Sequence, residues 1–404
     1  MSDAPTTAEA VDAAYRDEWS RIVATLIRIT GDWSLAEDSA AEAFESALAT
    51  WPRGGVPSKP GAWLTTVAKN RALDRLRRAA TLDRKLEDVA AMTALEDLDP
   101  DGEEIADDRL RLLFTCCHPA LPLESRVALT LRVVGGLTTA QIGRAFLVGE
   151  ATVAQRIVRA KRKIVAAGIP YRVPETHRLP ERLSGVLAVL YLAFNEGYTA
   201  VEQVDVADEA IRVTRALAEL MPAEPEILGL LALMLMQHSR RDARVRDGEL
   251  VTLDDQDRTR WDSAAIAEGR ALLAEAGRHR RPGVYQLQAA IAAVHASAPT
   301  PEDTDWVAVV ALYDRLSILA PGPVVGLNRA IAVSRASGAD AGLAALEEVA
   351  PALAAYPRLP AARADLLRRA GRHAEAAAHY DDAIRLAVTE PERRALRRRR
   401  DEIL

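Results

Sequence analysis

The residues best suited to chemistry in this chain are polar side chains that recur along one short segment. Between Gly136 and Ile164 the sequence reads GLTTAQIGRAFLVGEATVAQRIVRAKRKI. Its polar residues include a set spaced by three, four and three positions, which share one face of a helix: Thr152, Gln155, Arg159 and Arg162. Gln and Arg side chains can form paired hydrogen bonds with the edges of adenine and guanine. The pattern therefore predicts contact with nucleic acid.

Two short helices would position this stripe. Thr138 followed by Gln141 is a capping-box pattern that begins the first helix, and Gly149 ends it. The second helix begins at about Glu150 and carries an apolar face opposite the stripe. That face consists of Val153, Ile157, Ala160 and Ile164. We therefore expect a helix-turn-helix, whose DNA-contacting residues are Thr152, Gln155, Arg156, Arg159, Arg162 and Lys163.

A second basic segment lies about 80 residues earlier in the chain. From Lys69 to Lys85 there are seven basic and two acidic residues, so a second contact with an anion is expected. Two helices precede it, with apolar faces within residues 15–29 and 40–51. The second of these helices also bears an acidic side that includes Asp38 and Glu42, which can bind a basic partner or remain solvated. The loop RGGVPSKPG (53–61) separates it from the basic helix.

The composition favours an all-α protein of several domains. The chain has 404 residues, of which 49% are hydrophobic but only 4% aromatic, a balance typical of closely packed small helices. No apolar run is long enough to span a membrane and no export leader is recognisable, so we expect a cytoplasmic protein without a membrane partner. The adjacent Cys116 and Cys117 are expected to be a buried structural pair, and no cofactor-binding motif is present.

Charge changes sign sharply along the middle of the chain. Residues 83–108 include eleven acidic and two basic residues, whereas residues 109–172 include eleven basic and two acidic ones. We expect the first segment to be an acidic linker and the second to be a module that binds a polyanion.

The half of the chain after Tyr171 is rich in Ala and Leu. Tyr313 and Tyr380 begin similar segments and lie 67 positions apart, about two periods of the ~34-residue tetratricopeptide repeat. The scattered histidines give no metal-ligand spacing, so an interaction surface is favoured over an enzyme. The polar segment 247–262 is either an ordered functional loop or an exposed connection, and we favour the connection.

These motifs together resemble a known family. AEDSAAEAF (36–44), AWLTTVAKNRALDRLRR (62–78), the acidic linker and the helix-turn-helix occur in the order seen in extracytoplasmic-function sigma factors of bacterial RNA polymerase. FTCCHPALP (114–122) and AFNEGY (193–198) resemble the subgroup with a tetratricopeptide-like tail. The resemblance implies sigma region 2 at 8–82, an acidic linker at 83–108, sigma region 4 at 109–170, a helical extension at 171–282 and tetratricopeptide-like repeats at 283–404.

The resemblance also implies roles for individual residues. Region 2 would bind the clamp helices of the polymerase largest subunit through Asp38 and Glu42, and region 4 would meet the polymerase flap. Region 2 would also capture the melted minus-ten element with Trp63, Asn70, Arg71, Arg75, Arg77 and Arg78. The helix-turn-helix would read the minus-thirty-five element as duplex, and the extension would contact the sigma domains or the polymerase. Trp63 is either a stacking platform for a flipped base or part of the core.

Two other functions stay open from the residues alone. A stand-alone helix-turn-helix regulator with a sensing repeat domain would bind duplex DNA without polymerase. An interaction scaffold, whose basic faces only confer solubility, would show no salt-dependent binding of DNA.

Overall fold

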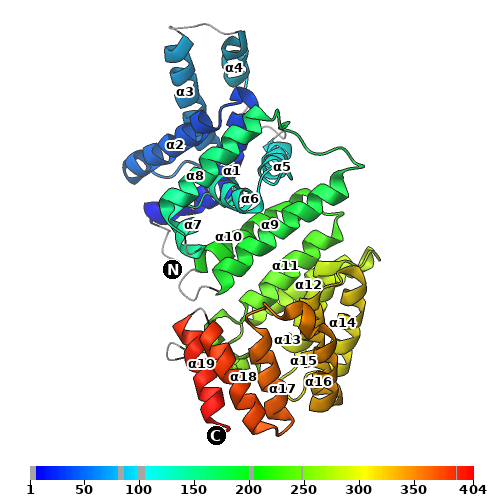
Figure 1. Ribbon diagram of the computed structural model, residues 1–404. Coiled ribbons are helices and arrows are strands. Elements are labelled where there is room, and N and C mark those ends of the chain that lie inside the picture. The colour runs from blue at the N-terminus through cyan, green and yellow to red at the C-terminus, as the bar shows by residue number, and fades with distance from the viewer. Residues whose placement is uncertain are drawn as a thin grey trace. The chain divides into compact units, whose positions relative to one another are not determined.

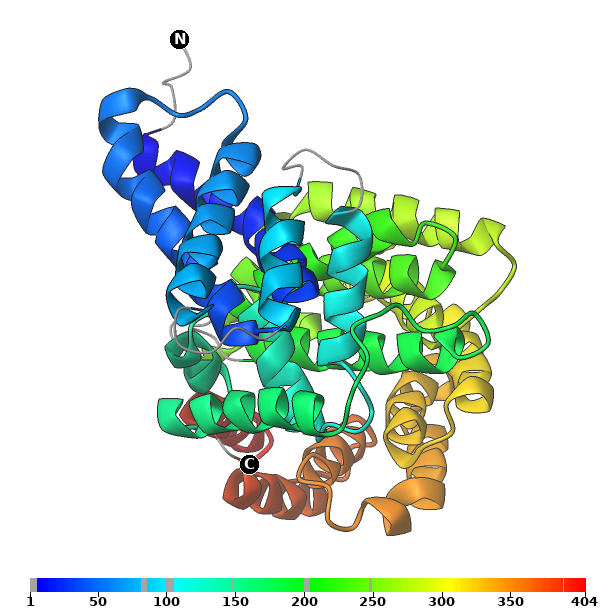
Figure 2. The same ribbon diagram turned by 90° about the horizontal axis from the view of Figure 1, so that it is seen from above.

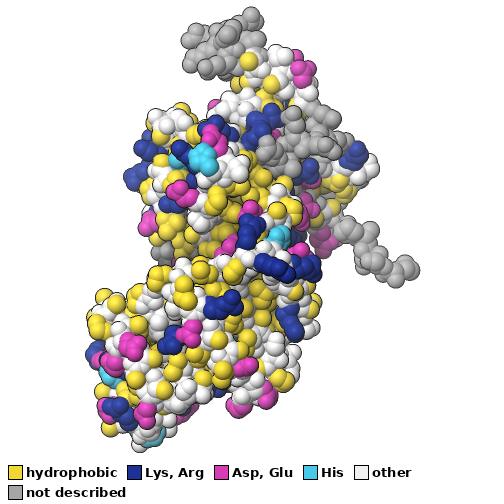
Figure 3. Space-filling model, turned by 90° about the vertical axis from the view of Figure 1, so that its right-hand side faces the viewer, with side chains coloured by type: hydrophobic (Ala, Val, Ile, Leu, Met, Phe, Trp, Pro, Cys, Tyr) yellow, Lys and Arg dark blue, Asp and Glu magenta, His cyan; other side chains and the backbone are white. Residues whose placement is uncertain are grey.

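The computed structural model describes residues 6–80, 86–98, 105–146, 148–199, 204–246, 249–387 and 389–404. It divides into two compact units, Met1–Leu220 and Met221–Leu404. In each unit, Lys and Arg side chains are interspersed with Asp and Glu side chains on the visible face (Figure 3). None of the described helices is both long and apolar enough to cross a membrane.

The first unit is helical throughout its described part (Figure 1). Its N-terminal module consists of α1 (Thr7–Thr30), α2 (Trp33–Gly54) and α3 (Pro60–Ala80). Then follow α4 (Leu86–Glu96) and α5 (Ile105–Cys116). The middle module consists of α6 (Leu123–Leu129), the π-helix η1 (Thr130–Val134), α7 (Thr139–Ala145) and α8 (Glu150–Ala166). The unit ends with α9 (Leu179–Thr199) and α10 (Val204–Leu220).

Local signals in the sequence define the N-terminal module. Thr6 and Glu9 form a capping box at the start of α1, and Gly31 ends α1 with a φ of 67°. Asp32 then caps α2 by accepting hydrogen bonds from the backbone of its first turn. The apolar faces expected for the first two helices form the core, with Trp19 and Phe44 buried. Because α3 already begins at Pro60, the loop expected at 53–61 is shorter than its Gly and Pro residues suggest.

The middle module confirms the expected helix-turn-helix elements. Thr138 and Gln141 form both hydrogen bonds of the capping box of α7, and Gly149 is the N-cap of α8. The four apolar residues of α8 are all buried: Val153, Ile157, Ala160 and Ile164. Cys116 and Cys117 are buried free thiols, as expected. Burial raises the pKa of both thiols, so they remain protonated and unreactive.

The boundary between the two units falls inside the segment 171–282, which the sequence suggested as one extension. Helices α9 and α10 pack against each other and against α5, α6, α7 and η1, so they belong to the first unit. The two helices approach closely at Gly197, where an added Cβ would lie 2.4 Å from the backbone nitrogen of Ala207. A side chain at this position would push α10 away from α9.

The second unit begins with α11 (Pro225–His238), which packs on α12 (Ser263–Arg278) and α13 (Val284–Ser297). It continues with α14 (Trp306–Leu319), α15 (Pro323–Ser337), α16 (Ala339–Val349), the 3-10 helix η5 (Ala350–Leu353), α17 (Leu359–Arg369), α18 (His373–Leu386) and α19 (Glu390–Asp401). From α13 onward, consecutive helices pack as a series of hairpins, coloured yellow to red in Figures 1 and 2. Tyr380 of α18 is buried, and so are Ala376 and Ala383 on either side of it in the sequence. The small alanine side chains let α18 approach its neighbours closely.

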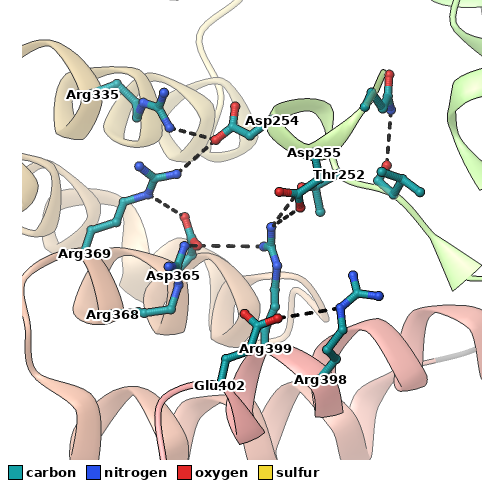
Figure 4. A network of polar contacts seen from close by, with 12 residues as sticks. Thr252, Asp254, Asp255, Arg335, Asp365, Arg368, Arg369, Arg398, Arg399 and Glu402 are labelled. Carbon is teal, nitrogen blue, oxygen red and sulfur yellow. Dashed lines mark hydrogen bonds and ion pairs between the residues drawn. The ribbon is translucent and has the colours of Figure 1, made fainter. Parts of the chain in front are cut away.

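The segment 247–262 was expected to be an exposed connection, yet its described part is ordered and bound to distant helices. The strands β1 (Val245–Arg246) and β2 (Glu249–Leu250) form a short antiparallel pair. Three 3-10 turns belong to the same region: η2 (Arg241–Ala243), η3 (Leu253–Asp255) and η4 (Arg258–Arg260). In Figure 4, Asp254 accepts hydrogen bonds from Arg335 of α15 at 2.7 Å and from Arg369 of α17 at 3.1 Å.

The same segment also reaches the last helix of the chain. Arg399 of α19 donates hydrogen bonds to the Thr252 hydroxyl at 2.9 Å and to Asp255 at 3.4 Å (Figure 4). Two consecutive carboxylates therefore fix the segment to three helices that lie 80 or more residues away in the chain. The helical period of the sequence did not predict this ordered segment, because ion pairs between distant segments leave no periodic signal.

The close contact of α9 with α10 can be tested with two glycines of one helix. We expect Gly197→Ala to destabilise the protein by about 1–3 kcal/mol, because the new methyl group would overlap the α10 backbone. Gly185→Ala is the matched control, since the nearest atom to its Cβ would be 3.9 Å away. It should be neutral or stabilise the helix by up to ~1 kcal/mol. Urea unfolding measures both, and equal effects would contradict the close packing.

Candidate nucleic-acid interface

The polar stripe of α8 faces solvent. The exposed residues among those expected to contact DNA are Thr152, Gln155, Arg159, Arg162 and Lys163. The apolar residues on the opposite side of the helix are buried. The amphipathic pattern has therefore oriented the helix as expected, with side chains that can form hydrogen bonds available to a groove of DNA.

The turn before α8 is held by contacts that fix the angle between the two helices. The Thr139 hydroxyl in α7 donates to a carboxylate oxygen of Glu150 in α8 at 2.6 Å. At Gly143 an added Cβ would lie 2.9 Å from the carbonyl oxygen of Val148. This close approach requires glycine and presents α8 as a rigid element.

Two cations of α8 are already engaged in ion pairs. Arg156 lies 2.6 Å from Glu124 of α6, so this arginine, expected to contact DNA, is held against its own module. Lys161 lies 2.5 Å from Glu37 of α2, and Arg132 of η1 lies 3.6 Å from the same carboxylate. Glu37 is only 8% exposed, so these contacts attach the middle module to the N-terminal module through an almost buried charge.

The acidic side of α2 and the basic side of α3 neutralise each other. Arg75 donates to Asp38 at 2.9 Å and also to Glu42. Arg71 lies 3.5 Å from Glu42. The hydrogen bonds to Asp38 and Glu42 raise the pKa of Arg75, so its guanidinium is charged near neutral pH. The structure thus pairs the two residues expected to bind polymerase with two that were expected to bind DNA.

The remaining residues expected at the minus-ten element differ in whether other side chains already contact them. Asn70 and Arg78 are exposed on α3. Trp63 is half-buried and packs edge to face against Trp51, with ring centroids 5.6 Å apart, which favours a role in the core. Arg77 donates to Glu96 of α4 at 2.8 Å, so part of the acidic linker covers the basic side of α3.

The two modules are joined where helix η1 ends. The last carbonyl groups of a helix have no partner within it, and here side chains from other elements supply the donors. Trp19 donates through its indole nitrogen to the Val133 oxygen at 3.1 Å. Tyr15 donates through its hydroxyl to the Gly136 oxygen at 2.8 Å. Both donors lie on α1, so the N-terminal module satisfies the open end of the middle module.

Helix α10 contributes to the same junction. Arg212 donates to the Gly135 oxygen at 3.4 Å and to the Arg16 carbonyl oxygen of α1. Its guanidinium also forms two hydrogen bonds with Glu209, at 2.9 and 2.6 Å. One arginine of the extension therefore connects both modules.

Glu209 has an unusual environment for a carboxylate. It is 7% exposed, and this burial raises its pKa to about 7, although the charge and hydrogen bonds of Arg212 act in the opposite direction. The proton on Glu209 is therefore gained or lost near neutral pH.

Sequence reasoning missed the residues that join the modules. Glu37 shares the face of Ala40 and Phe44, so an acid within an apolar stripe was a signal available in the sequence. Glu209 and Arg212 are three residues apart on one helix, which looks like an ordinary surface pair. Only the fold shows that this pair is buried against other elements.

Comparisons with known proteins match the modules to families. Residues 14–81 match Sigma-70 region 2, and residues 111–164 match Sigma-70, region 4. Residues 182–277, which extend over α9 to α12, match a family of unknown function, DUF6596. No solved structure matches this chain.

Three relatives extend this comparison. An uncharacterized protein of Rhizobium meliloti, R00370, is 44% identical over 405 residues, covering 97% of this chain and 96% of that protein. The probable ECF RNA polymerase sigma factor SigI of Mycobacterium tuberculosis is 32% identical over 43% of this chain and 60% of its own length. The ECF RNA polymerase sigma factor SigK of Mycolicibacterium vanbaalenii is 29% identical over 39% of this chain and 82% of its own length.

The two modules define the class of protein: a sigma factor of the sigma-70 type, which is not an enzyme. The chain carries the region 2 and region 4 domains found in extracytoplasmic-function sigma factors, followed by a helical extension whose residues 182–277 match the DUF6596 family. The N-terminal module is region 2, and the middle module is region 4.

The protonation of Glu209 leads to a testable pH dependence. The pKa of Glu209 is about 7 in the folded protein, whereas an unfolded Glu has a pKa of about 4.3. The stability contributed by the neutral carboxyl is fully present below about pH 4 and is lost as the pH rises through about 7. Between about pH 4 and pH 8 the unmodified protein should therefore lose on the order of 3–4 kcal/mol of stability that Glu209→Gln keeps.

Urea unfolding at several pH values measures this difference. Glu219→Gln is the control, because Glu219 is exposed on the same helix. Parallel pH profiles for Glu209→Gln and the unmodified protein would show that Glu209 is already ionised in the folded state.

Proposed function

We propose that this chain directs bacterial RNA polymerase to specific promoters and assists in melting them. The observation that carries the proposal is the exposed polar stripe of α8 in a chain that also carries region 2. In this proposal, Gln155 and Arg159 read base edges in the minus-thirty-five element, while Arg162 and Lys163 contact phosphates. Asn70 and Arg78 are exposed on α3 and would bind the unpaired strand of the minus-ten element.

In this proposal the contact between region 2 and region 4 is a closed form, which must open before both promoter elements are bound. The two elements are centred roughly 25 base pairs apart, and B-DNA advances about 34 Å in ten base pairs, so they lie about 80 Å apart. Region 2 and region 4 are instead in direct contact through Trp19, Tyr15 and Glu37. We therefore expect the modules to separate when the protein engages polymerase and promoter.

Part of the extension is proposed to hold this closed form. Arg212 of α10 is hydrogen-bonded to the backbone of both modules, so α10 acts as an intramolecular contact between the extension and the sigma domains. By this proposal the first part of the extension opposes promoter binding until polymerase or another signal displaces it.

Binding to polymerase would also change the ion pairs of region 2. Asp38 and Glu42 are proposed to meet the clamp helices of the largest subunit, and region 4 the flap. Because both acids are paired with Arg75, their exchange to a basic partner would release Arg75 and Arg71 for the phosphates of the melted strand. Binding of polymerase by Asp38 and Glu42 would then come first, and binding of the melted strand by Arg71 and Arg75 would follow.

The helices of the second unit are proposed to be tetratricopeptide-like repeats. Consecutive helices from α13 to α19 pack against each other as hairpins, most extensively α15 with α16 and α17 with α18. Tyr313 lies in α14 and Tyr380 in α18, the second helix of its pair with α17. Their spacing of 67 positions in the sequence also supports the proposal. Such repeats present an extended surface to a protein partner.

A stand-alone regulator remains the second candidate, because the α8 stripe is exposed even in the closed form. This alternative requires specific binding to duplex DNA in the absence of polymerase.

Reconstituted transcription separates these functions. With core polymerase and a selected promoter, the full chain should direct initiation. Arg159→Ala should weaken promoter binding by about 1–3 kcal/mol and relax the sequence preference at one position. Asn70→Ala should slow open-complex formation, measured by permanganate reactivity, without weakening duplex binding.

Arg172→Ala is the control for both variants, because Arg172 is an arginine outside α8 and α3 with a 63% exposed side chain. Failure of the full chain to co-purify with core polymerase, together with tight specific binding to duplex, would favour the stand-alone regulator.

The closing role of α10 is testable with a double variant. Removing Arg212 alone would leave Glu209 as an unpaired buried acid, so Glu209→Gln combined with Arg212→Met removes both charges while conserving volume. This variant should have a larger radius of gyration in X-ray scattering and should bind core polymerase more tightly than the unmodified protein. Arg270→Ala, an exposed site on α12, is the control. Weaker polymerase binding by the double variant would contradict a closing role.

A further inference from the structure

The first unit contains a cavity that none of the roles above uses. It has a volume of about 440 Å³ and lies where α1, α5 and α10 meet. Its charged lining consists of Asp17, Glu18, Arg21, Arg109, Arg212, Arg215 and Glu219. The size falls within the range of about 300–1,000 Å³ typical of sites for small molecules.

The arginines that line this cavity are less exposed than two of its three acids. All four guanidinium-bearing side chains are partly buried, whereas Asp17 and Glu219 are exposed. The third acid, Glu18, pairs within its own helix with Arg21, at 3.2 Å. The four arginines and three acids give the lining a formal charge of +1, and two of the three acids are exposed to solvent.

Arg109 is the least compensated of these cations. Within the part of the chain that the structure describes, no hydrogen bond or ion pair engages its guanidinium. Burial lowers the pKa of Arg109, and the nearby Arg21 and Arg212 lower it further, whereas the charges of Glu219 and Glu18 act in the opposite direction. Holding a cation away from water beside two like charges is unfavourable unless an anion compensates it.

We propose that this cavity is a binding site for a small phosphate-bearing anion, such as a pyrophosphate or the phosphate chain of a nucleotide. Guanidinium groups present forked donors that match phosphate oxygens. Arg109 would be the central contact, with Arg21 and Arg215 on either side. A concave site of this size fits a small molecule better than the backbone of a duplex, which needs an extended surface.

The site exists only while α10 is seated on α1 and α5, because each of the three elements supplies at least one arginine. A bound anion therefore stabilises the seated position of α10 by mass action. Resting on the proposed function, the anion favours the closed form and connects promoter binding to the concentration of a phosphorylated metabolite.

Calorimetric titration of the full chain with inorganic pyrophosphate, at constant ionic strength, tests the site. We expect saturable binding of one pyrophosphate per chain and a rise in the thermal unfolding temperature. Arg109→Gln should weaken binding at least tenfold, and Arg215→Gln should weaken it to a smaller extent. Arg172→Ala, outside the cavity, should bind pyrophosphate normally.

Circular dichroism of each variant shows whether it is folded, and Arg215→Gln provides a second test if Arg109→Gln is not. Absence of saturable binding, or equal binding by Arg109→Gln and the unmodified protein, would overturn the proposal. A loss of duplex DNA binding in Arg109→Gln as large as the loss of pyrophosphate binding would also overturn it, because the surface would then belong to nucleic acid. These readouts need no polymerase, so the site and the proposed function can fail separately.

Discussion

The contact between region 2 and region 4 depends on the carbonyl groups at the end of η1, which find no donors within their own helix. A helix that ends inside a protein must find donors for its last carbonyls, since water is excluded there. Val133, Gly135 and Gly136 receive theirs from Trp19, Arg212 and Tyr15 respectively. Two of these donors belong to region 2 and one to the extension. A single backbone requirement thus brings together three parts of the chain that are far apart in sequence.

Aromatic packing reinforces this junction. Tyr15 stacks on Trp19 with ring centroids 5.0 Å apart and meets Phe44 edge to face at 4.9 Å. Arg132 of η1 lies over the Trp19 ring at 5.9 Å, a cation–π contact from the opposite module. Trp19 is therefore both the centre of the region 2 core and the side chain that contacts region 4. The Trp19 side chain is only 2% exposed, so the proposed opening of the unit would carry an energetic cost that contacts with polymerase or promoter would have to offset.

Local features could be predicted from the sequence, whereas contacts between modules could not. The capping box at Thr138, the helix break at Gly149 and the buried face of α8 follow from residues within one or two turns of each other. The same periodicity indicated that Gln155 and Arg159 are exposed. It could not show that Arg156 is occupied by Glu124 or Arg75 by Asp38, because the charge pattern of a helix does not identify which opposite charge folds against it. The place of α9 and α10 in the first unit also depends on long-range packing, which helical propensity does not encode.

The buried pair of Glu209 and Arg212 is suited to a contact that must open. Removing two charges from water costs nearly as much as their attraction returns, so such a pair specifies an arrangement more than it stabilises it. The raised pKa of Glu209 reports the same balance, because it shows that ionisation of this carboxyl is disfavoured even beside an arginine. In the proposed mechanism, a polar contact with little net stability would keep the closed and open forms close in free energy. Modest contacts from polymerase, promoter or a bound anion would then be enough to shift the population between them.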